Sequence, residues 1–128
     1  MPHTINVKIY YEDTDAGGIV YHANYLRYLE RARTEFLKEK GIDVAEYHRK
    51  GVFFAVVHVD IYFKSPAQLG DIITVTTEVA ELKNASITVK NQIFKEDKLL
   101  VEAFITFACL NSNYRPMRLP DAFLKLKN

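Results

Sequence analysis

The sequence has a single cysteine, Cys109, and no apolar run long enough to cross a membrane. A lone thiol cannot form a disulfide within the chain, and its apolar neighbours predict a buried thiol in a reducing compartment. A bilayer-spanning helix needs about 20 consecutive apolar residues, and no stretch here approaches that length. The opening segment "MPHTINVKIYY" also lacks the basic start and apolar block of a signal peptide. These absences predict a cytoplasmic protein with no transmembrane segment.

The sequence also lacks an excess of either charge. It has 17 Lys and Arg residues against 16 Asp and Glu residues, which gives a formal net charge of +1. A marked positive excess is what drives bulk electrostatic binding to nucleic acid or to anionic lipid. No nucleic-acid partner is therefore expected.

Several signatures of metal, cofactor or nucleophile sites are missing. The four histidines and one cysteine show none of the spacings that a zinc site requires. There is no phosphate-binding P-loop and no GxGxxG after a strand, so no cofactor is expected. The absence of GxSxG argues against a serine hydrolase.

What the sequence does have is regular apolar periodicity. Of its 128 residues, 48% are hydrophobic, which is enough to form one core. This length predicts a single domain over 1–128. Alternation predicts a first strand over Thr4–Tyr11. Helical spacing predicts a long helix that Asn24 caps and Gly41 ends. The apolar positions of this helix are Tyr25, Leu29, Ala32 and Phe36, flanked by Leu26, Tyr28 and Leu37. Further elements are expected as a short helix over 43–50, strands over 52–63, 72–82, 85–95 and 99–110, and a short helical end.

One long helix among five strands restricts the architecture. A single amphipathic helix cannot cover both faces of a long antiparallel sheet, so its natural place is across one face. This predicts an α+β fold in which a curved antiparallel five-stranded sheet wraps a long central helix. Long apolar strands need their edges protected. We therefore expect a homodimer, or a homotetramer built as a dimer of dimers, in which a site could lie between subunits.

Two segments carry a family likeness. The stretch "YEDTDAGGIVYHANYLRYLERARTEFL" resembles the active-site loop and central helix of the YbgC-type acyl-CoA thioesterases, which belong to the 4-hydroxybenzoyl-CoA thioesterase group of hotdog-fold proteins. The stretch "YFKSPAQLGDIITVTTEV" resembles a second signature of that family. The resemblance covers essentially the whole chain in order and spacing. It implies a hotdog fold and an acyl-CoA substrate. Part of the family is similar to proteins linked with the Tol-Pal cell-envelope system, which implies a role near phospholipid metabolism.

The resemblance also implies roles for residues of the first segment. Asp15 would be the catalytic carboxylate, and His22 and Tyr11 would assist it. Asp15 could attack the thioester as a nucleophile or deprotonate a water, and the sequence leaves both routes open. Gly17 and Gly18 would let the substrate approach the main chain closely. Backbone N–H groups at the start of the helix, that of His22 among them, would donate to the thioester oxygen.

Other polar residues have weaker assignments. His58 lies near Asp60 on one strand and is either half of a core pair or part of the pocket wall. Lys64 and Arg115, near predicted strand ends, could meet the phosphates of coenzyme A. His3 and His48 are expected to be surface residues. Glu12 and Asp13 are expected to face away from the substrate, since three carboxylates in one pocket would repel one another.

Two other classes of function stay open. A hotdog hydratase or dehydratase would prefer a histidine base together with an acid on the central helix, and the predicted helix contains no histidine. A non-catalytic module that recognises acyl carrier protein is the other alternative, and acyl carrier protein is therefore a second candidate partner. The sequence has no marked charge pattern that supports or excludes such a module.

Overall fold

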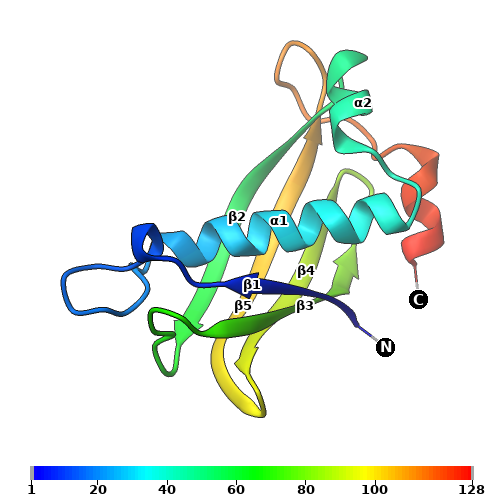
Figure 1. Ribbon diagram of the computed structural model, residues 1–128. Coiled ribbons are helices and arrows are strands. Elements are labelled where there is room, and N and C mark those ends of the chain that lie inside the picture. The colour runs from blue at the N-terminus through cyan, green and yellow to red at the C-terminus, as the bar shows by residue number, and fades with distance from the viewer. Residues whose placement is uncertain (1, 128) are drawn as a thin grey trace.

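A computed structural model describes residues 2–127 of the chain (Figure 1). The strands are β1 (His3–Lys8), β2 (Phe53–Phe63), β3 (Ile72–Leu82), β4 (Ser86–Lys95) and β5 (Lys98–Leu110). The helices are α1 (Asn24–Glu39) and α2 (Val44–Arg49), with short 3-10 helices η1 (Tyr11–Asp13) and η2 (Asp121–Leu126). Strands β2 to β5 lie within one residue of their predicted bounds, because alternating apolar residues and turn signals mark them clearly in the sequence.

The five strands form one antiparallel sheet in the order β1-β3-β4-β5-β2. The sheet curves around α1, which crosses its inner face (Figure 1). Alternate residues of β5 are buried against the helix, and these are Val101, Ala103, Ile105, Phe107 and Cys109. This arrangement confirms the predicted α+β class and the buried thiol of Cys109.

Helix α1 buries one face, as its periodicity predicted. The buried side chains are Tyr25, Tyr28, Leu29, Ala32, Phe36 and Leu37. Leu26 was expected on this apolar face, yet it is 43% exposed. It lies with Val56 and Val59 of β2 along a shallow pocket at the sheet edge. Apolar surface between α1 and β2 is therefore left open in the single chain.

The first strand ends earlier than predicted. It stops at Lys8, and Ile9 then exchanges backbone hydrogen bonds with the loop before β3, donating to the Asp71 carbonyl and accepting from Gly70 N–H. The side chain of Asp13 accepts a hydrogen bond from Tyr10 N–H at 2.8 Å, which holds the chain in the η1 turn. Tyr11 therefore begins a turn, and the prediction that it closes a strand is wrong.

Two further predictions about polar residues are wrong. Asn24 does not cap α1: it is the first helical residue, and its side chain donates instead to the Asp13 carbonyl at 2.9 Å. His3 is not a surface residue, because β1 lies beneath the C-terminal half of α1. Its imidazole is 12% exposed, contacts Glu39 at 3.1 Å and packs edge-on against Phe36. His48, by contrast, is exposed as predicted.

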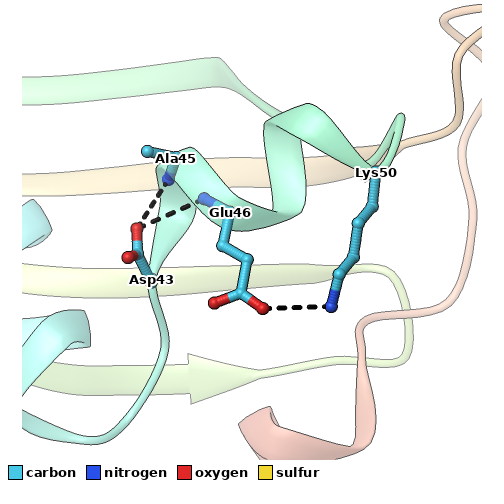
Figure 2. A network of polar contacts seen from close by, with 4 residues as sticks. All are labelled: Asp43, Ala45, Glu46 and Lys50. Carbon is cyan, nitrogen blue, oxygen red and sulfur yellow. Dashed lines mark hydrogen bonds and ion pairs between the residues drawn. The ribbon is translucent and has the colours of Figure 1, made fainter.

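Helix α2 leads the chain into β2, and a side-chain cap fixes where it begins (Figure 2). The Asp43 carboxylate accepts hydrogen bonds from Ala45 N–H at 3.0 Å and Glu46 N–H at 3.3 Å. Glu46 and Lys50 then form an ion pair one turn apart, at 3.1 Å. Gly51, with φ of +82°, ends this segment as predicted. None of the helices between residues 2 and 127 is long and apolar enough to cross a membrane.

Candidate active site

The acidic loop forms a tight hairpin between η1 and α1. Asp15 N–H donates to the Ile19 carbonyl at 2.9 Å, and Tyr21 N–H donates to the Asp13 carbonyl at 3.0 Å. Gly18 turns the chain with φ of +79°, which glycine adopts without steric cost. The hairpin places Asp15 at its turn and brings the chain back to the start of α1.

The Asp15 carboxylate is exposed, and one of its oxygens is held. Its Oδ1 accepts a hydrogen bond from Gly17 N–H at 2.8 Å. A β-carbon at Gly17 would lie only 3.3 Å from this oxygen, so glycine suits the close approach. Among residues 2–127, Oδ2 has no hydrogen-bond partner. The carboxylate is thus oriented through one oxygen and has the other available for chemistry.

The neighbouring acids have different surroundings. Asp13 accepts the hydrogen bond from Tyr10 N–H and lies beside the buried hydroxyl of Tyr28. Burial raises the pKa of Tyr28, and the Asp13 carboxylate raises it further. Glu12 is exposed. These contacts give Asp13 a structural role and leave Glu12 in solvent.

The chain enters α1 through a turn that leaves backbone donors free. Asn24 N–H donates to the Tyr21 carbonyl at 2.8 Å, and Tyr25 N–H donates to the His22 carbonyl at 3.4 Å. The N–H groups of His22 and Ala23 find no acceptor in the part of the chain that the structure describes. The first N–H groups of a helix carry partial positive charge, so these two are suited to an anionic oxygen.

A pocket of about 270 Å³ lies against this helix start. Its lining comes from the hairpin, α1 and the loop after β2, and consists of Ile19, Val20, His22, Tyr25, Phe63, Lys64, Ser65 and Pro66. The Phe63 ring lies 6.5 Å from the His22 ring and 5.6 Å from the Tyr25 ring, centroid to centroid. The wall is mainly apolar, with His22, Tyr25 and Lys64 as its ionisable groups. Such a pocket suits an apolar group attached to a polar, charged one.

Hydrogen bonds hold the part of the pocket wall formed by Val20, Tyr25 and Lys64 in place. The buried hydroxyl of Tyr25 accepts from Ala67 N–H at 3.0 Å, and the Ala67 carbonyl accepts from Val20 N–H at 2.9 Å. Lys64 N–H donates to the Leu100 carbonyl at 2.8 Å, which ties the loop to β5. Burial raises the pKa of Tyr25, so its phenol stays protonated at neutral pH. Tyr25 therefore positions the pocket wall.

The structure brings only part of the predicted site together within one chain. His22 and Lys64 line the pocket, while Asp15, Gly17 and Gly18 lie on the adjoining hairpin. Tyr11 is 82% exposed and makes no hydrogen bond to Asp15. His58 pairs with Thr106 in the middle of β2, outside the pocket lining. The site roles of Tyr11 and His58 stay predictions.

Arg115 does not join Lys64. Lys64 follows one end of β2, whereas Arg115 follows Leu110, which pairs with Phe53 at the other end of that strand. Sequence reasoning also missed Phe63, Ser65 and Pro66 as pocket residues. Their signal was the change from an apolar strand to a polar, proline-containing loop in "YFKSP", but only the fold shows that this loop packs beside the hairpin.

Comparison with known proteins places the chain in a family. The model of the thioesterase-like superfamily matches residues 10–126. The chain belongs to this superfamily. The acyl-CoA thioester hydrolase YbgC of Escherichia coli is 35% identical over 120 residues, covering 92% of this chain and 90% of the relative. The acyl-CoA thioesterase YbgC of Haemophilus influenzae is 37% identical over 116 residues, covering 89% of this chain and 85% of the relative.

Solved thioesterase structures share the fold. A Bartonella henselae protein described as a probable thioesterase superposes with a TM-score of 0.89 at 34% identity, covering 94% of this chain and all of that one (100%). The resemblance to YbgC-type thioesterases, the hotdog fold and the class of thioester hydrolase are thereby confirmed. The roles of individual residues in this thioesterase are proposals.

Proposed function

We propose that this thioesterase hydrolyses the thioester of acyl-CoA to a free acid and coenzyme A. The observation that carries the proposal is the apolar pocket, bordered by His22, by N–H groups at the start of α1 that find no acceptor among residues 2–127, and by the Asp15 hairpin. An apolar wall suits the acyl group, and the other features suit the reacting carbonyl. The names of the Escherichia coli and Haemophilus influenzae relatives support this substrate class.

In this proposal Asp15 supplies the reactive carboxylate. As a general base, its free oxygen takes a proton from a water whose oxygen attacks the carbonyl carbon. The tetrahedral intermediate then expels the coenzyme A thiolate, which accepts a proton. As a nucleophile, the carboxylate would attack the carbon itself, expel the thiolate and form an anhydride that water hydrolyses. Both routes use one carboxylate and need no strong acid, because a thiolate leaves readily.

The carbonyl oxygen would be stabilised by the His22 N–H at the start of α1. A donor of this kind contributes on the order of 3 kcal/mol in measured enzymes. The His22 side chain would orient the water or the substrate, and Lys64 would meet a phosphate of coenzyme A. Tyr11 would assist Asp15, and His58 would contact substrate, once a second subunit encloses the pocket.

The second subunit would pair through β2. This strand is eleven residues long and lies at the sheet edge, where no strand of residues 2–127 pairs with its outer side. Val57 is 60% exposed, Val59 38% and Tyr62 52%, so the edge presents apolar side chains as well as free backbone groups. A long apolar edge strand is a ready template for another strand. The proposed assembly is a homodimer joined by β2, or a dimer of such dimers.

The alternatives have less support. Helix α1 contains no histidine, which weighs against a hydratase or dehydratase with its base on that helix. Acyl carrier protein stays an alternative partner. A cytoplasmic location and a link to phospholipid metabolism or the Tol-Pal system rest on the family resemblance and on the sequence alone.

The test is an assay of free thiol release with purified protein and a panel of acyl-CoA substrates of differing chain length and aromatic character. We expect turnover well above buffer for at least one member of the panel. A wild-type rate equal to buffer across the whole panel would defeat the proposal.

A further inference from the structure

Asn24 joins the acidic hairpin to helix α1 and takes no part in the proposed reaction. Its side-chain Nδ2 donates to the Asp13 carbonyl at 2.9 Å, and its backbone N–H donates to the Tyr21 carbonyl at 2.8 Å. Asp13 belongs to the outgoing arm of the hairpin, residues 13–15, and Tyr21 to the returning arm, residues 19–21. One residue at the start of the helix therefore holds both arms.

The partner of the Asn24 amide fixes how that amide is oriented. The Asp13 carbonyl oxygen can only accept, so the amide nitrogen and not the amide oxygen has to face it. The same carbonyl accepts from Tyr21 N–H at 3.0 Å, so both of its lone pairs are used. Asn24 is half-buried, which partly shields the bond from competing water.

The two arms are otherwise held by different parts of the chain. The returning arm is bonded to the loop between β2 and β3, where Val20 N–H donates to the Ala67 carbonyl at 2.9 Å. The outgoing arm, which carries Asp15, has no hydrogen bond to that loop within residues 2–127. Across the same residues, the Asn24 amide makes the only hydrogen bond between α1 and the outgoing arm.

The proposed reaction needs two parts of this region at a fixed separation. The Asp15 carboxylate lies on the outgoing arm, whereas the free N–H groups of His22 and Ala23 lie in the turn that Asn24 N–H closes. Both parts act on one carbonyl group of the substrate. Groups that act together in this way must be held to within about 0.5 Å of the productive geometry.

We propose that Asn24 is a positioning residue for thioester hydrolysis, which fixes the Asp15 carboxylate relative to the backbone donors of His22 and Ala23. It acts through the Asp13 carbonyl and touches neither the substrate nor the reacting atoms. This inference rests on the proposed function of the hairpin and the pocket.

A purely structural role is the alternative for Asn24. An asparagine at a helix start ordinarily caps a free N–H of the first turn, yet Asn24 is already helical and α1 has no side-chain cap. A structural bond would contribute to stability and leave kcat unchanged when it is lost. A positioning bond would lower kcat, because a misplacement of about 1 Å can cost on the order of a hundredfold in rate.

Two variants of Asn24 separate these roles. Asn24→Ala removes the donor without adding charge. Asn24→Asp has nearly the same shape, but its carboxylate cannot donate, and an acid in the first turn favours the helix. We expect kcat to fall about thirtyfold in both variants. KM for acyl-CoA should stay within about twofold, because other hydrogen bonds hold the apolar wall of the pocket.

Either of two kinetic results would overturn the proposal. An unchanged kcat in Asn24→Ala would show that the bond is structural only. A fall confined to Asn24→Asp would show that the added charge, and not the lost donor, affects the reaction.

Asn6 provides the matched control. Its side chain accepts from the Thr74 hydroxyl at 3.0 Å and links β1 to β3, outside the pocket lining. Asn6→Ala therefore also removes one side-chain hydrogen bond between two elements, and kcat should stay within about twofold of wild type. A fall in Asn6→Ala as large as that in Asn24→Ala would show general loosening of the fold and overturn the assignment.

Amide hydrogen exchange distinguishes a displaced hairpin from an unfolded one. Asp15 N–H donates to the Ile19 carbonyl and Tyr21 N–H to the Asp13 carbonyl, and neither bond involves Asn24. We expect both amides to keep wild-type protection in Asn24→Ala, since only the link to α1 is lost. Loss of protection at both would show that Asn24 folds the hairpin and does not merely position it, which would overturn the proposal.

The wild-type protein separates this inference from the proposed function. A wild type without turnover across the acyl-CoA panel would defeat the proposed function, and with it a positioning role in that reaction. Turnover by wild type together with an equal kcat in Asn24→Ala would defeat the positioning role alone.

Discussion

Hydrogen bonds distinguish the acids of the "EDTD" loop from one another. Asp13 holds the η1 turn through Tyr10 N–H, whereas Asp15 keeps one oxygen unpaired among the described residues. The sequence shows three carboxylates within four positions, but it does not show which hydrogen bonds each one makes. Asp13, for example, also accepts a hydrogen bond at its backbone carbonyl from the side chain of Asn24, eleven residues away. The family motif indicates Asp15, and its catalytic role stays a prediction.

Tyr28 allows a test at the residue scale. Its buried hydroxyl finds no hydrogen-bond partner between residues 2 and 127, so Tyr28→Phe should change the free energy of unfolding at pH 7 by less than about 1 kcal/mol. Its pKa is raised in the folded protein. The unfolded tyrosine ionises near pH 10, so the stabilisation is complete below about pH 10 and is lost as the pH rises further. Urea unfolding at pH 7 and pH 11 should show a smaller alkaline loss in Tyr28→Phe.

Tyr25 is the matched control for that experiment. Its hydroxyl accepts the hydrogen bond from buried Ala67 N–H, and Tyr25→Phe leaves that donor unpaired. The expected loss is about 1–3 kcal/mol at pH 7. A larger loss in Tyr28→Phe than in Tyr25→Phe would show that Tyr28 has a hydrogen-bond partner after all.

At the scale of elements, the sequence predicts the bounds that local patterns set and misses those that long-range contacts set. Strands β2 to β5 and helix α2 follow from apolar periodicity and turn residues, which act within a few residues. The end of β1 does not, because Ile9 is bound by Gly70 and Asp71 from a distant loop. Leu26 fits the helical period of α1 yet is 43% exposed, because no strand among residues 2–127 covers it.

Helix α2 provides the test at this scale. Asp43→Ala removes the cap over Ala45 N–H and Glu46 N–H and should lower the free energy of unfolding by about 1 kcal/mol. Lys50→Ala removes an exposed ion pair with Glu46 and the approach of the ammonium to the Tyr47 ring at 6.0 Å, and should cost less than about 0.5 kcal/mol. Chemical denaturation of both variants measures the difference. Equal losses in the two variants would show that the side-chain cap adds nothing.

At the scale of the whole molecule, the sequence predicts least well which site residues the fold brings together. It found the hairpin, His22 and Lys64, since these lie in two recognisable motifs. It placed Lys64 with Arg115, which the fold separates by the length of β2. It missed Phe63 and Pro66, because a pocket wall made by a loop 40 residues from the helix start has no local signature.

The exposed edge of β2 leads to a prediction for the assembly. Val57→Lys places a charge at the centre of the proposed subunit interface and should convert the dimer to monomers. Leu124→Lys is the matched control, because Leu124 is 57% exposed and Val57 60%, while Leu124 lies in η2 and not on the edge strand itself. Sedimentation velocity reports both. A Val57→Lys protein that stays dimeric would refute pairing through β2.

The central claim is that Asp15 carries out acyl-CoA hydrolysis, and the most direct measurement is kcat/KM of Asp15→Asn. Asparagine keeps the side-chain oxygen that accepts from Gly17 N–H, so the hairpin should persist while the reactive carboxylate is lost. We predict a fall of at least about a hundredfold, with Glu12→Gln, its exposed neighbour, within about threefold of wild type. Wild-type activity in Asp15→Asn would contradict the account, and a simultaneous loss in His22→Ala would assign the reaction to His22 instead.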